Sequence, residues 1–478
     1  MFSRQEMDVL LPESLPFLFC FLLFSFSLLS LAFLKKWLVS KTNDLLSFCY
    51  PFPEGMVFPF KIVSLYFVNV NGGFEMKNIL LLTALLAAWL TPVLACTSAV
   101  VSGRATPDGR PLLWKHRDTD FLKNHVEYVR GEKYDFIAVV NSADFHLKRE
   151  AWIGTNSAGF ALMNTQSYNL VDVKDGEERG EANGRVIYRA LEVCATVDDF
   201  CHFLDTLAKP SRIEANFGVI DAQGGAMMFE VDYYTYKIYD ANDPATAPDG
   251  YVARTNFSVS GQYGPGAGVV RYKEAEWVLP PLARAQAVTP QRIFSDLSRS
   301  FHNCLLGIDL RQPPFTGAEA SGWFVDQDFI PRSSTSCSVV VQGVKKGEAA
   351  ELTTMWTVLG YPPTGVAVPL WIDEDLPQMV TMDRSLGTSP LSAASLRLKD
   401  NVFSLKWGMG SNRYLHWSLL YNAEGNGYMQ RLAPFEEENF RLTEPVLEGW
   451  RRKGRVDRQE MQTLYRKLDR EEMWKYYK

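Results

Sequence analysis

The stretch of sequence that decides the fold is Cys96-Thr97-Ser98-Ala99-Val100-Val101. Apolar and polar residues alternate through it, as in a β-strand, and Thr106-Pro107-Asp108-Gly109 then supplies the residue types of a tight turn. The apolar pattern resumes at Pro111-Leu112-Leu113-Trp114. These three segments predict a β-hairpin whose first strand begins at Cys96.

A second hairpin is predicted at residues 151–164, where two short strands flank Asn156-Ser157-Ala158-Gly159. Helical periodicity follows over about 184–207, and Thr196-Val197-Asp198-Asp199 has the residue types of a helix N-cap with an acidic first turn. Further strands are predicted at residues 217–220, 226–231, 251–256, 337–341 and 353–358. Clusters of strands separated by a helical block indicate two sheets covered by helices.

The last part of the chain, residues 388–478, becomes rich in charged residues with helical periodicity, as at Glu436-Glu437-Glu438 and over residues 455–478. We interpret these charges as a solvated helix face without a specific partner. The predicted organisation is therefore a domain over residues 96–387 followed by a mainly helical C-terminal extension.

The residues before this domain are typical of a secretory signal peptide over residues 76–95. Met76-Lys77-Asn78 is followed by an apolar run over residues 79–90, and small residues stand at positions −3 and −1 of a cleavage site after Ala95. Cleavage there would export the protein, to the periplasm or out of the cell, and leave Cys96 as the first residue of the mature chain.

Residues 1–75 have two interpretations. They contain an apolar segment, residues 15–34, that is long enough to cross a bilayer and is followed by Lys35 and Lys36. If this leader is translated, the segment is a membrane anchor. If translation starts at Met76, the leader is not part of the protein. Membrane contact is expected only through the leader or the signal segment.

The composition argues against several kinds of partner. The net charge is −6 and 22% of residues are charged, which gives no reason to expect nucleic acid. Of seven cysteines, Cys20 and Cys49 lie in the leader, and neither the remaining cysteines nor the six histidines have the spacing of a metal site. No metal or cofactor is expected. We interpret Cys194 and Cys201 as small buried hydrophobes in preference to a disulfide.

Cys96 can supply both a nucleophile and its base if it is the first residue of the mature chain. A thiol has a pKa of about 8.5 and an α-amino group one of about 7.7 to 8.0, so the amine can accept the thiol proton at neutral pH. The alternative is a lipoprotein, in which Cys96 carries a lipid and anchors a non-catalytic binding protein. Bulky Leu94 suits a lipidation signal poorly, and a strand pattern begins at once where a loose tether is expected. The nucleophile is the favoured interpretation.

Three motifs follow one another in the sequence: Cys96-Thr97-Ser98, then Ala105-Thr106-Pro107-Asp108-Gly109, then Arg117-Asp118-Thr119-Asp120. Together they resemble the cysteine N-terminal nucleophile hydrolases, a family that includes choloylglycine hydrolases, penicillin V acylases and isopenicillin N acyltransferases. By that resemblance, Arg117 lowers the pKa of the thiol or binds substrate, and Asp120 holds the α-amino group. The second residue of the last motif is an aspartate where the family commonly has asparagine.

Later segments extend the resemblance. Residues 154–161 are similar to the family's second hairpin, in which an asparagine, here Asn156, contributes its backbone N–H to the oxyanion hole. Residues 252–257 are similar to the family's strand that ends in Thr-Asn, which makes Asn256 the expected side-chain donor to the oxyanion. Arg271 resembles the arginine that orders the surroundings of the cysteine.

The resemblance implies an α+β fold, the four-layer αββα sandwich. It also implies cleavage of a linear amide C–N bond through a thioester, with transfer of the acyl group to water or to an acceptor amine. The expected partner is a small-molecule amide. Conjugated bile salts, penicillin-like side-chain amides, N-acyl amino acids and small peptides all remain open, as do a cysteine dipeptidase of the same fold and a homo-oligomeric assembly.

Overall fold

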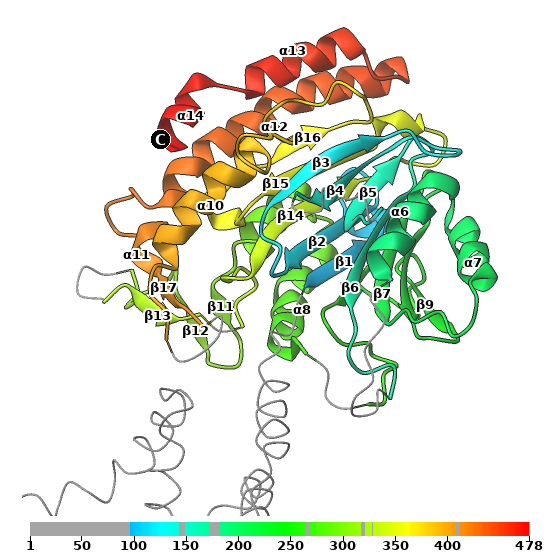
Figure 1. The fold of residues 1–478 in the computed structure, drawn as a ribbon, viewed down its shortest axis with the longest axis horizontal. Helices are drawn as coiled ribbons and strands as arrows, with labels where there is room; N and C mark the ends of the chain where they lie inside the picture. Colours follow the sequence, from blue (N-terminus) through cyan, green and yellow to red (C-terminus); the bar gives the residue numbers. More distant parts are fainter. Residues whose placement is uncertain are drawn as a thin grey trace, which may run out of the picture. The chain divides into compact units, whose positions relative to one another are not determined.

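The computed structural model describes residues 96–142, 149–172, 182–263, 267–316, 321–326, 328–407 and 412–477. The predicted leader (1–75) and the predicted signal peptide (76–95) lie outside this described part of the chain. Two sheets stack on each other, with helices on their outer faces (Figure 1).

The first sheet has six antiparallel strands in the order β10-β1-β2-β14-β15-β16. In chain order these strands are β1 (Thr97–Val101), β2 (Leu112–Asp118), β10 (Tyr251–Arg254), β14 (Thr335–Gln342), β15 (Thr354–Leu359) and β16 (Val368–Leu370). The predicted first hairpin is present as β1 and β2, with the 3-10 turn η1 (Gly103–Ala105) between them. Strand β1 is paired on both edges, so Cys96 lies at the start of an interior strand.

The second sheet has seven antiparallel strands that follow one another in sequence order. They are β3 (Asn124–Val129), β4 (Phe136–Asn141), β5 (Ile153–Asn156), β6 (Ala161–Gln166), β7 (Ala215–Ile220), β8 (Ala226–Val231) and β9 (Tyr236–Asp240). The predicted second hairpin is confirmed as β5 and β6, with the turn at the expected residues.

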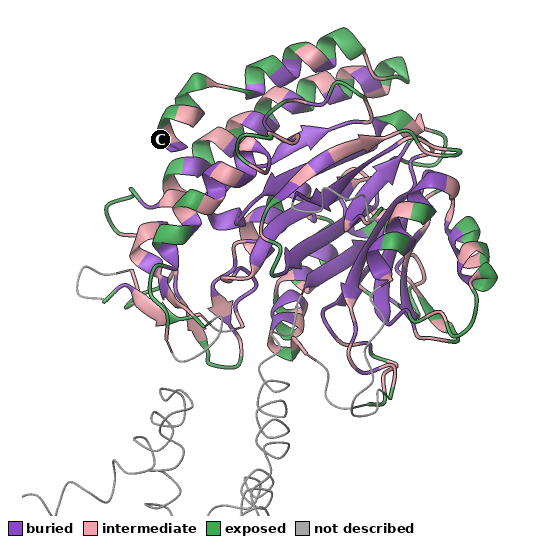
Figure 2. Ribbon diagram, viewed as in Figure 1, coloured by how far each residue is buried: buried purple, intermediate pink, exposed green. Residues whose placement is uncertain are grey.

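The two sheets bury one continuous apolar layer between them. Val100 and Leu113 of the first sheet belong to the same buried cluster as Ile137 and Met163 of the second. Alternate residues along each strand point into this layer, as in a β-sandwich. The strands of both sheets are largely buried, and the exposed residues gather on the helices and loops (Figure 2).

Helices cover both outer faces. On the seven-stranded sheet, α6 (Asn183–Val193) and α7 (Val197–Thr206) pack Ile187 and Phe200 into a second apolar cluster, and α7 begins with the predicted Thr196–Asp199 capping box. On the six-stranded sheet, α8 (Val269–Arg284), α9 (Pro290–Arg292) and η2 (Ile293–Leu297) pack against the face that carries Trp114. The layers therefore run helix, sheet, sheet, helix, and the predicted αββα fold is confirmed.

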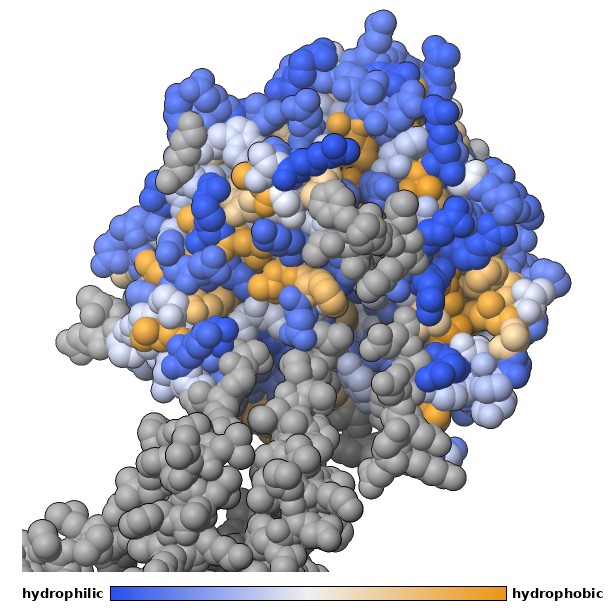
Figure 3. Space-filling model, viewed as in Figure 1, coloured by the Kyte–Doolittle hydropathy of each residue, from blue (hydrophilic) through white to orange (hydrophobic). Residues whose placement is uncertain are grey.

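The C-terminal region is mainly helical, as predicted. It contains α10 (Pro390–Val402), α11 (Trp417–Leu420), α12 (Tyr428–Lys453), α13 (Arg458–Leu468) and α14 (Glu471–Tyr477). It packs directly on the six-stranded sheet, because Phe440 of α12 stacks on Trp356 of β15 with ring centroids 4.0 Å apart. The outward surfaces of α13 and α14 are hydrophilic (Figure 3).

Short elements complete the described chain. They are β11 (His302–Asn303), β12 (Ile308–Asp309), β13 (Trp323–Val325), β17 (Tyr414–His416), η3 (Ala350–Leu352) and η4 (Pro362–Thr364). The five cysteines of the described part, including Cys194 and Cys201, form no disulfide. Among the same residues, no helix has the length and apolarity needed to cross a membrane.

Gly218 of β7 tests the contact between the sheets. A Cβ at this position would collide with the side chains of Met163 in the same sheet and of Leu113 in the other sheet, so Gly218→Ala forces these side chains to shift. We expect it to lower the free energy of unfolding by about 1–3 kcal/mol, measured by urea denaturation. Gly449 of α12 has no atom near its missing Cβ, so Gly449→Ala is the control and should stabilise the protein by about 0.5–1 kcal/mol. Equal effects of the two substitutions would contradict close packing at Gly218.

Candidate active site

Strand register brings four residues to one level at the same end of the six-stranded sheet. The pairing of β1 with β10 and with β2, extended to the start of β1, puts Cys96 beside Asn256 on one side and beside Arg117 on the other. Arg117 is in turn opposite Cys337 of β14. Directly opposed residues of a sheet lie side by side on one face. Asn256, Cys96, Arg117 and Cys337 therefore form a row contributed by four neighbouring strands.

Cys96 lies on the inner face of this row. By strand alternation it shares its face with Ser98 and Val100, and Val100 belongs to the cluster between the sheets. The residue is 8% exposed. Its Sγ donates a hydrogen bond to the backbone oxygen of Asp118 at 3.8 Å, so the thiol is held at the end of β2.

Arg271 fixes the start of β1 from the opposite face. Its Nη1 donates to the backbone oxygen of Cys96 at 2.5 Å and to Oγ1 of Thr97 at 2.9 Å, while Nη2 donates to Oδ1 of Asn256 at 3.1 Å. Burial lowers the pKa of Arg271 to about 9. Gly268, with φ 80°, begins α8 just before this arginine, and a side chain there would collide with the guanidinium. One buried side chain thus connects two of the predicted site residues.

Asn256 is held in a single orientation. Its Oδ1 accepts from Arg271, and its Nδ2 donates to the backbone oxygen of Gln166 on β6 at 2.9 Å. An amide nitrogen has two hydrogens, so one remains to be donated to another group. The side chain of Asn216 stiffens the same region by donating to the backbone oxygens of Thr255 and Phe257.

Arg117 is buried on the Cys96 side of β2. Its guanidinium donates to Oδ1 of Asn124 at 2.6 Å and to Oδ1 of Asn141 at 2.8 Å, and it lies 4.4 Å from the ring centre of Trp152. Burial lowers its pKa, while negative charge at Cys337 and Cys96 would raise it. The guanidinium of Arg117 is therefore a buried cation next to the thiol, and the oxygens that accept its hydrogen bonds are uncharged.

Lys115 is a second buried cation on the same face, and it was not among the predicted site residues. Its Nζ donates to Oδ1 of Asn164 at 2.7 Å and to the backbone oxygen of Trp152 at 3.0 Å, and both acceptors belong to the other sheet. The available signal in the sequence was two cationic residues, Lys115 and Arg117, at alternate positions of one predicted strand. Asn164, likewise unpredicted, lies across the gap between the sheets.

The two aspartates that follow Arg117 lie in different surroundings. Asp118 is buried, forms an ion pair with Arg332 at 2.9 Å and accepts from Oγ1 of Thr335 at 2.6 Å. Asp120 is exposed, beyond the end of β2. The structure therefore places the backbone of Asp118, and not the carboxylate of Asp120, in contact with the thiol of Cys96.

Asn156 lies at the other end of its strand from this group. Lys115 contacts the residue just before β5, whereas Asn156 is the last residue of β5, about 13 Å further along an extended strand. Its backbone N–H donates to the oxygen of Phe160, and its Nδ2 donates to the oxygens of Leu191 and Cys194 at the end of α6. The structure thus joins Cys96, Arg117, Asn256 and Arg271 but not Asn156.

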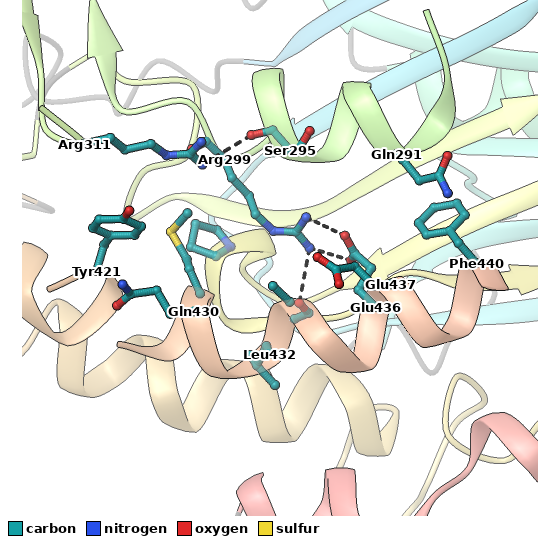
Figure 4. Close-up of a pocket in the computed structure, with 14 residues that line it drawn as sticks. Gln291, Ser295, Arg299, Arg311, Tyr421, Gln430, Leu432, Glu436, Glu437 and Phe440 are labelled. Carbon is teal, nitrogen blue, oxygen red and sulfur yellow. Dashed lines mark hydrogen bonds and ion pairs between the residues drawn. The ribbon is translucent and has the colours of Figure 1, made fainter. Parts of the chain in front are cut away.

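A cavity of about 470 Å³ lies elsewhere, between α12, η4 and the segment around η2 (Figure 4). Its floor holds an ion pair between Arg299 and Glu436, with Nη2 and Oε2 2.6 Å apart. Glu436 is buried, so its interpretation as part of a solvated face was wrong. None of the residues around Cys96 lines this cavity. In the described part of the chain, no group of three or more histidine, cysteine or acidic side chains could hold a metal ion.

Neither a protein-family model nor a curated protein matches the chain. Solved structures to which the chain is similar include the Caenorhabditis elegans N-acylethanolamine-hydrolyzing acid amidase (NAAA) ortholog, at 16% identity and a TM-score of 0.35, over 51% of this chain and 92% of that one. A variant of the conjugated bile acid hydrolase from Clostridium perfringens is similar at 9% identity and a TM-score of 0.37, over 59% and 94%. The penicillin V acylase from Agrobacterium tumefaciens is similar at 14% identity and a TM-score of 0.32, over 58% and 86%. No activity follows from similarity at this level.

Arg271 can be tested through stability. Arg271→Met removes a buried cation together with the three hydrogen bonds that it donates, and it leaves Oδ1 of Asn256 without its donor. We expect the free energy of unfolding to fall by about 2–3 kcal/mol in urea denaturation, the range for hydrogen bonds to charged groups. Arg284 on the same helix forms an exposed ion pair with Asp249, so Arg284→Met is the control and should change the free energy of unfolding much less. A smaller loss for Arg271→Met than for this control would refute the role of Arg271 as the link.

Proposed function

We propose that this protein is an exported amide hydrolase whose nucleophile is the thiol of Cys96, made the first residue of the chain by cleavage after Ala95. The observation that carries the proposal is the row formed by Asn256, Cys96 and Arg117. It combines a thiol, a cation and an oriented amide donor at the start of one interior strand. The sequence before Cys96, which has the pattern of a signal peptide, supports the same reading.

The proposed reaction begins when the α-amino group of Cys96 accepts the thiol proton. The thiolate attacks the carbonyl carbon of an amide, and the remaining N–H of the Asn256 side chain donates to the oxyanion. The C–N bond then breaks, and the leaving nitrogen takes the proton from the α-ammonium group. Water, or an acceptor amine, attacks the resulting thioester, which releases the acyl group and restores the thiol.

The surrounding residues have separate tasks in this mechanism. Arg117 favours the thiolate by its charge, and Arg271 holds the backbone of Cys96 and the side chain of Asn256 in register. The geometry favours Asn164 over Asn156 as the group that faces the carbonyl from the second sheet, because Asn164 lies across the gap from Lys115. The substrate we propose is a small-molecule linear amide.

The first test is the intact mass and N-terminal sequence of the protein expressed from Met76 in an exporting bacterial host. A free Cys96 terminus supports the proposal. A lipid on Cys96, or an uncleaved terminus, would contradict it and favour a membrane-anchored binding protein. In either case the result concerns Cys96 directly and does not depend on knowing the substrate.

The second test is activity on a panel of conjugated bile salts, penicillin V, N-acyl amino acids and dipeptides. Cys96→Ala should lower kcat/KM by at least about 1,000-fold, because it removes the nucleophile. Cys304 is a half-buried thiol that hydrogen-bonds to Val270 outside the row, so Cys304→Ala is the matched control and should keep wild-type activity. Cleavage of dipeptides alone would indicate a dipeptidase, and retained activity in Cys96→Ala would refute the mechanism.

A further inference from the structure

Lys115 is a cation that the mechanism above does not use, although it lies on the same face as the thiol. It occupies β2 two residues before Arg117 and is opposite Ser98 of β1, the second residue after Cys96. It is 1% exposed. Strand alternation gives Lys115, Arg117 and Cys96 one common face, toward the second sheet.

The ammonium group connects the two sheets at the level of the site. Its two hydrogen bonds go to Oδ1 of Asn164 on β6 and to the backbone oxygen of Trp152 just before β5. It also lies 5.7 Å from the ring centre of Trp152. Because an ammonium group can only donate, it fixes the amide of Asn164 with the oxygen toward Lys115 and the nitrogen away from it.

The charge of this lysine is not neutralised by a hydrogen-bonded carboxylate. Among the described residues, neither Lys115 nor Arg117 donates to an aspartate or glutamate. A buried cation without an anionic partner is costly, and a nearby anion relieves that cost. Burial lowers the pKa of Lys115 to about 8, and negative charge at Cys96 acts in the opposite direction.

The charged groups around Cys96 can be named from each element that packs on it. Strand β2 contributes Lys115 and Arg117, β14 contributes the thiol of Cys337, and α8 contributes Arg271. The carboxylate of Asp118 is engaged by Arg332 on the other side of β2. Burial raises the pKa of Cys337 to about 11, so this thiol stays neutral. Two carboxylates also act on these cations, because Asp118 raises the pKa of Lys115 and of Arg117, and Glu150 raises that of Arg117. The charged side chains of β2 on the same face as Cys96 are both cationic.

We propose that Lys115 is a positioning residue of this site, whose ammonium group holds Asn164 and the start of β5 against β2 and, together with Arg117, stabilises the thiolate of Cys96. This inference rests on the proposed function, since it assigns the lysine a task in forming the nucleophile. Lys115 acts through its charge and its two hydrogen bonds, without contact with the substrate.

The test is the pH dependence of alkylation of Cys96 by iodoacetamide between pH 5 and pH 10, followed by peptide mass spectrometry on the mature protein from the full chain. Lys115→Met should slow alkylation of Cys96 at neutral pH by about tenfold, because a cation next to the thiolate is lost. Lys115→Arg keeps the charge and should restore most of the wild-type profile. Superimposable profiles for wild type and Lys115→Met would overturn the proposal.

Lys399 of α10 provides the matched control. It is also a buried lysine, it donates to the backbone oxygen of Thr335 at 2.8 Å, and burial lowers its pKa to about 7. It does not belong to the row around Cys96, so Lys399→Met should leave the Cys96 profile unchanged. An equal shift in Lys399→Met would mean that losing any buried lysine has this effect, and would overturn the specific role of Lys115.

Two further measurements distinguish failure of the role of Lys115 from failure of the proposed function. Alkylation of Cys194, which is 1% exposed, reports global unfolding in the same samples. If Lys115→Met does not fold, Lys115→Gln replaces it because glutamine keeps a donor without the charge. A Cys96 that is blocked or unreactive in the wild-type protein defeats the proposed function itself. A reactive wild-type Cys96 with no change in the Lys115 variants defeats only the role of Lys115.

Discussion

The pairing of β1 on both of its edges is the constraint on which the candidate site depends. Strands β10 and β2 flank β1, and Cys96 is the residue just before β1. The two strand registers therefore determine which face the Cys96 side chain occupies and which residues lie beside it. Asn256 and Arg117 reach the same level through those registers and not through any local sequence signal. Arg271 then holds the end of the strand from the helix side, so the start of β1 is fixed on three sides.

Buried charge gives this region its chemical character. Lys115, Arg117 and Arg271 are each almost fully buried, and their hydrogen bonds go to amide, hydroxyl and backbone oxygens. Such partners accept hydrogen bonds without cancelling the charge, so the desolvation cost remains in the folded protein. A thiolate or an oxyanion at Cys96 would offset part of that cost, which links the stability of the region to its proposed chemistry.

The C-terminal helices contribute to the sandwich and not to the row around Cys96. Phe440 of α12 covers Trp356, and Glu436 forms its buried ion pair with Arg299 beside the six-stranded sheet. Glu436 also accepts from the backbone N–H of Ala367, so the carboxylate is satisfied on two sides. Helix α12 therefore covers the outer face of the sheet that carries Cys96. The sequence could not show which charged residues around Glu436 are buried and which are exposed.

The sequence by itself determined the local elements. Alternation and turn residues identified the two hairpins, and a capping box marked the start of α7. The motif order predicted Cys96, Arg117, Asn256 and Arg271 as site residues, and the structure places these four together. These features depend on neighbours within a few residues or on order along the chain, which a sequence displays directly. Asn156 was predicted from the same kind of motif. A turn asparagine has the same sequence pattern at either end of a sheet, so the sequence could not show that Asn156 lies at the end away from Cys96.

Which polar residues meet depends on how the two sheets stack. Lys115 and Asn164 are 49 positions apart in the chain and become partners because two sheets stack face to face. Asp118 and Asp120 are the same residue type two positions apart, yet β2 ends at Asp118, so Asp118 is buried and Asp120 is exposed. Contacts between stacked sheets depend on register and on packing distance, and these arise from the whole core and not from any single segment.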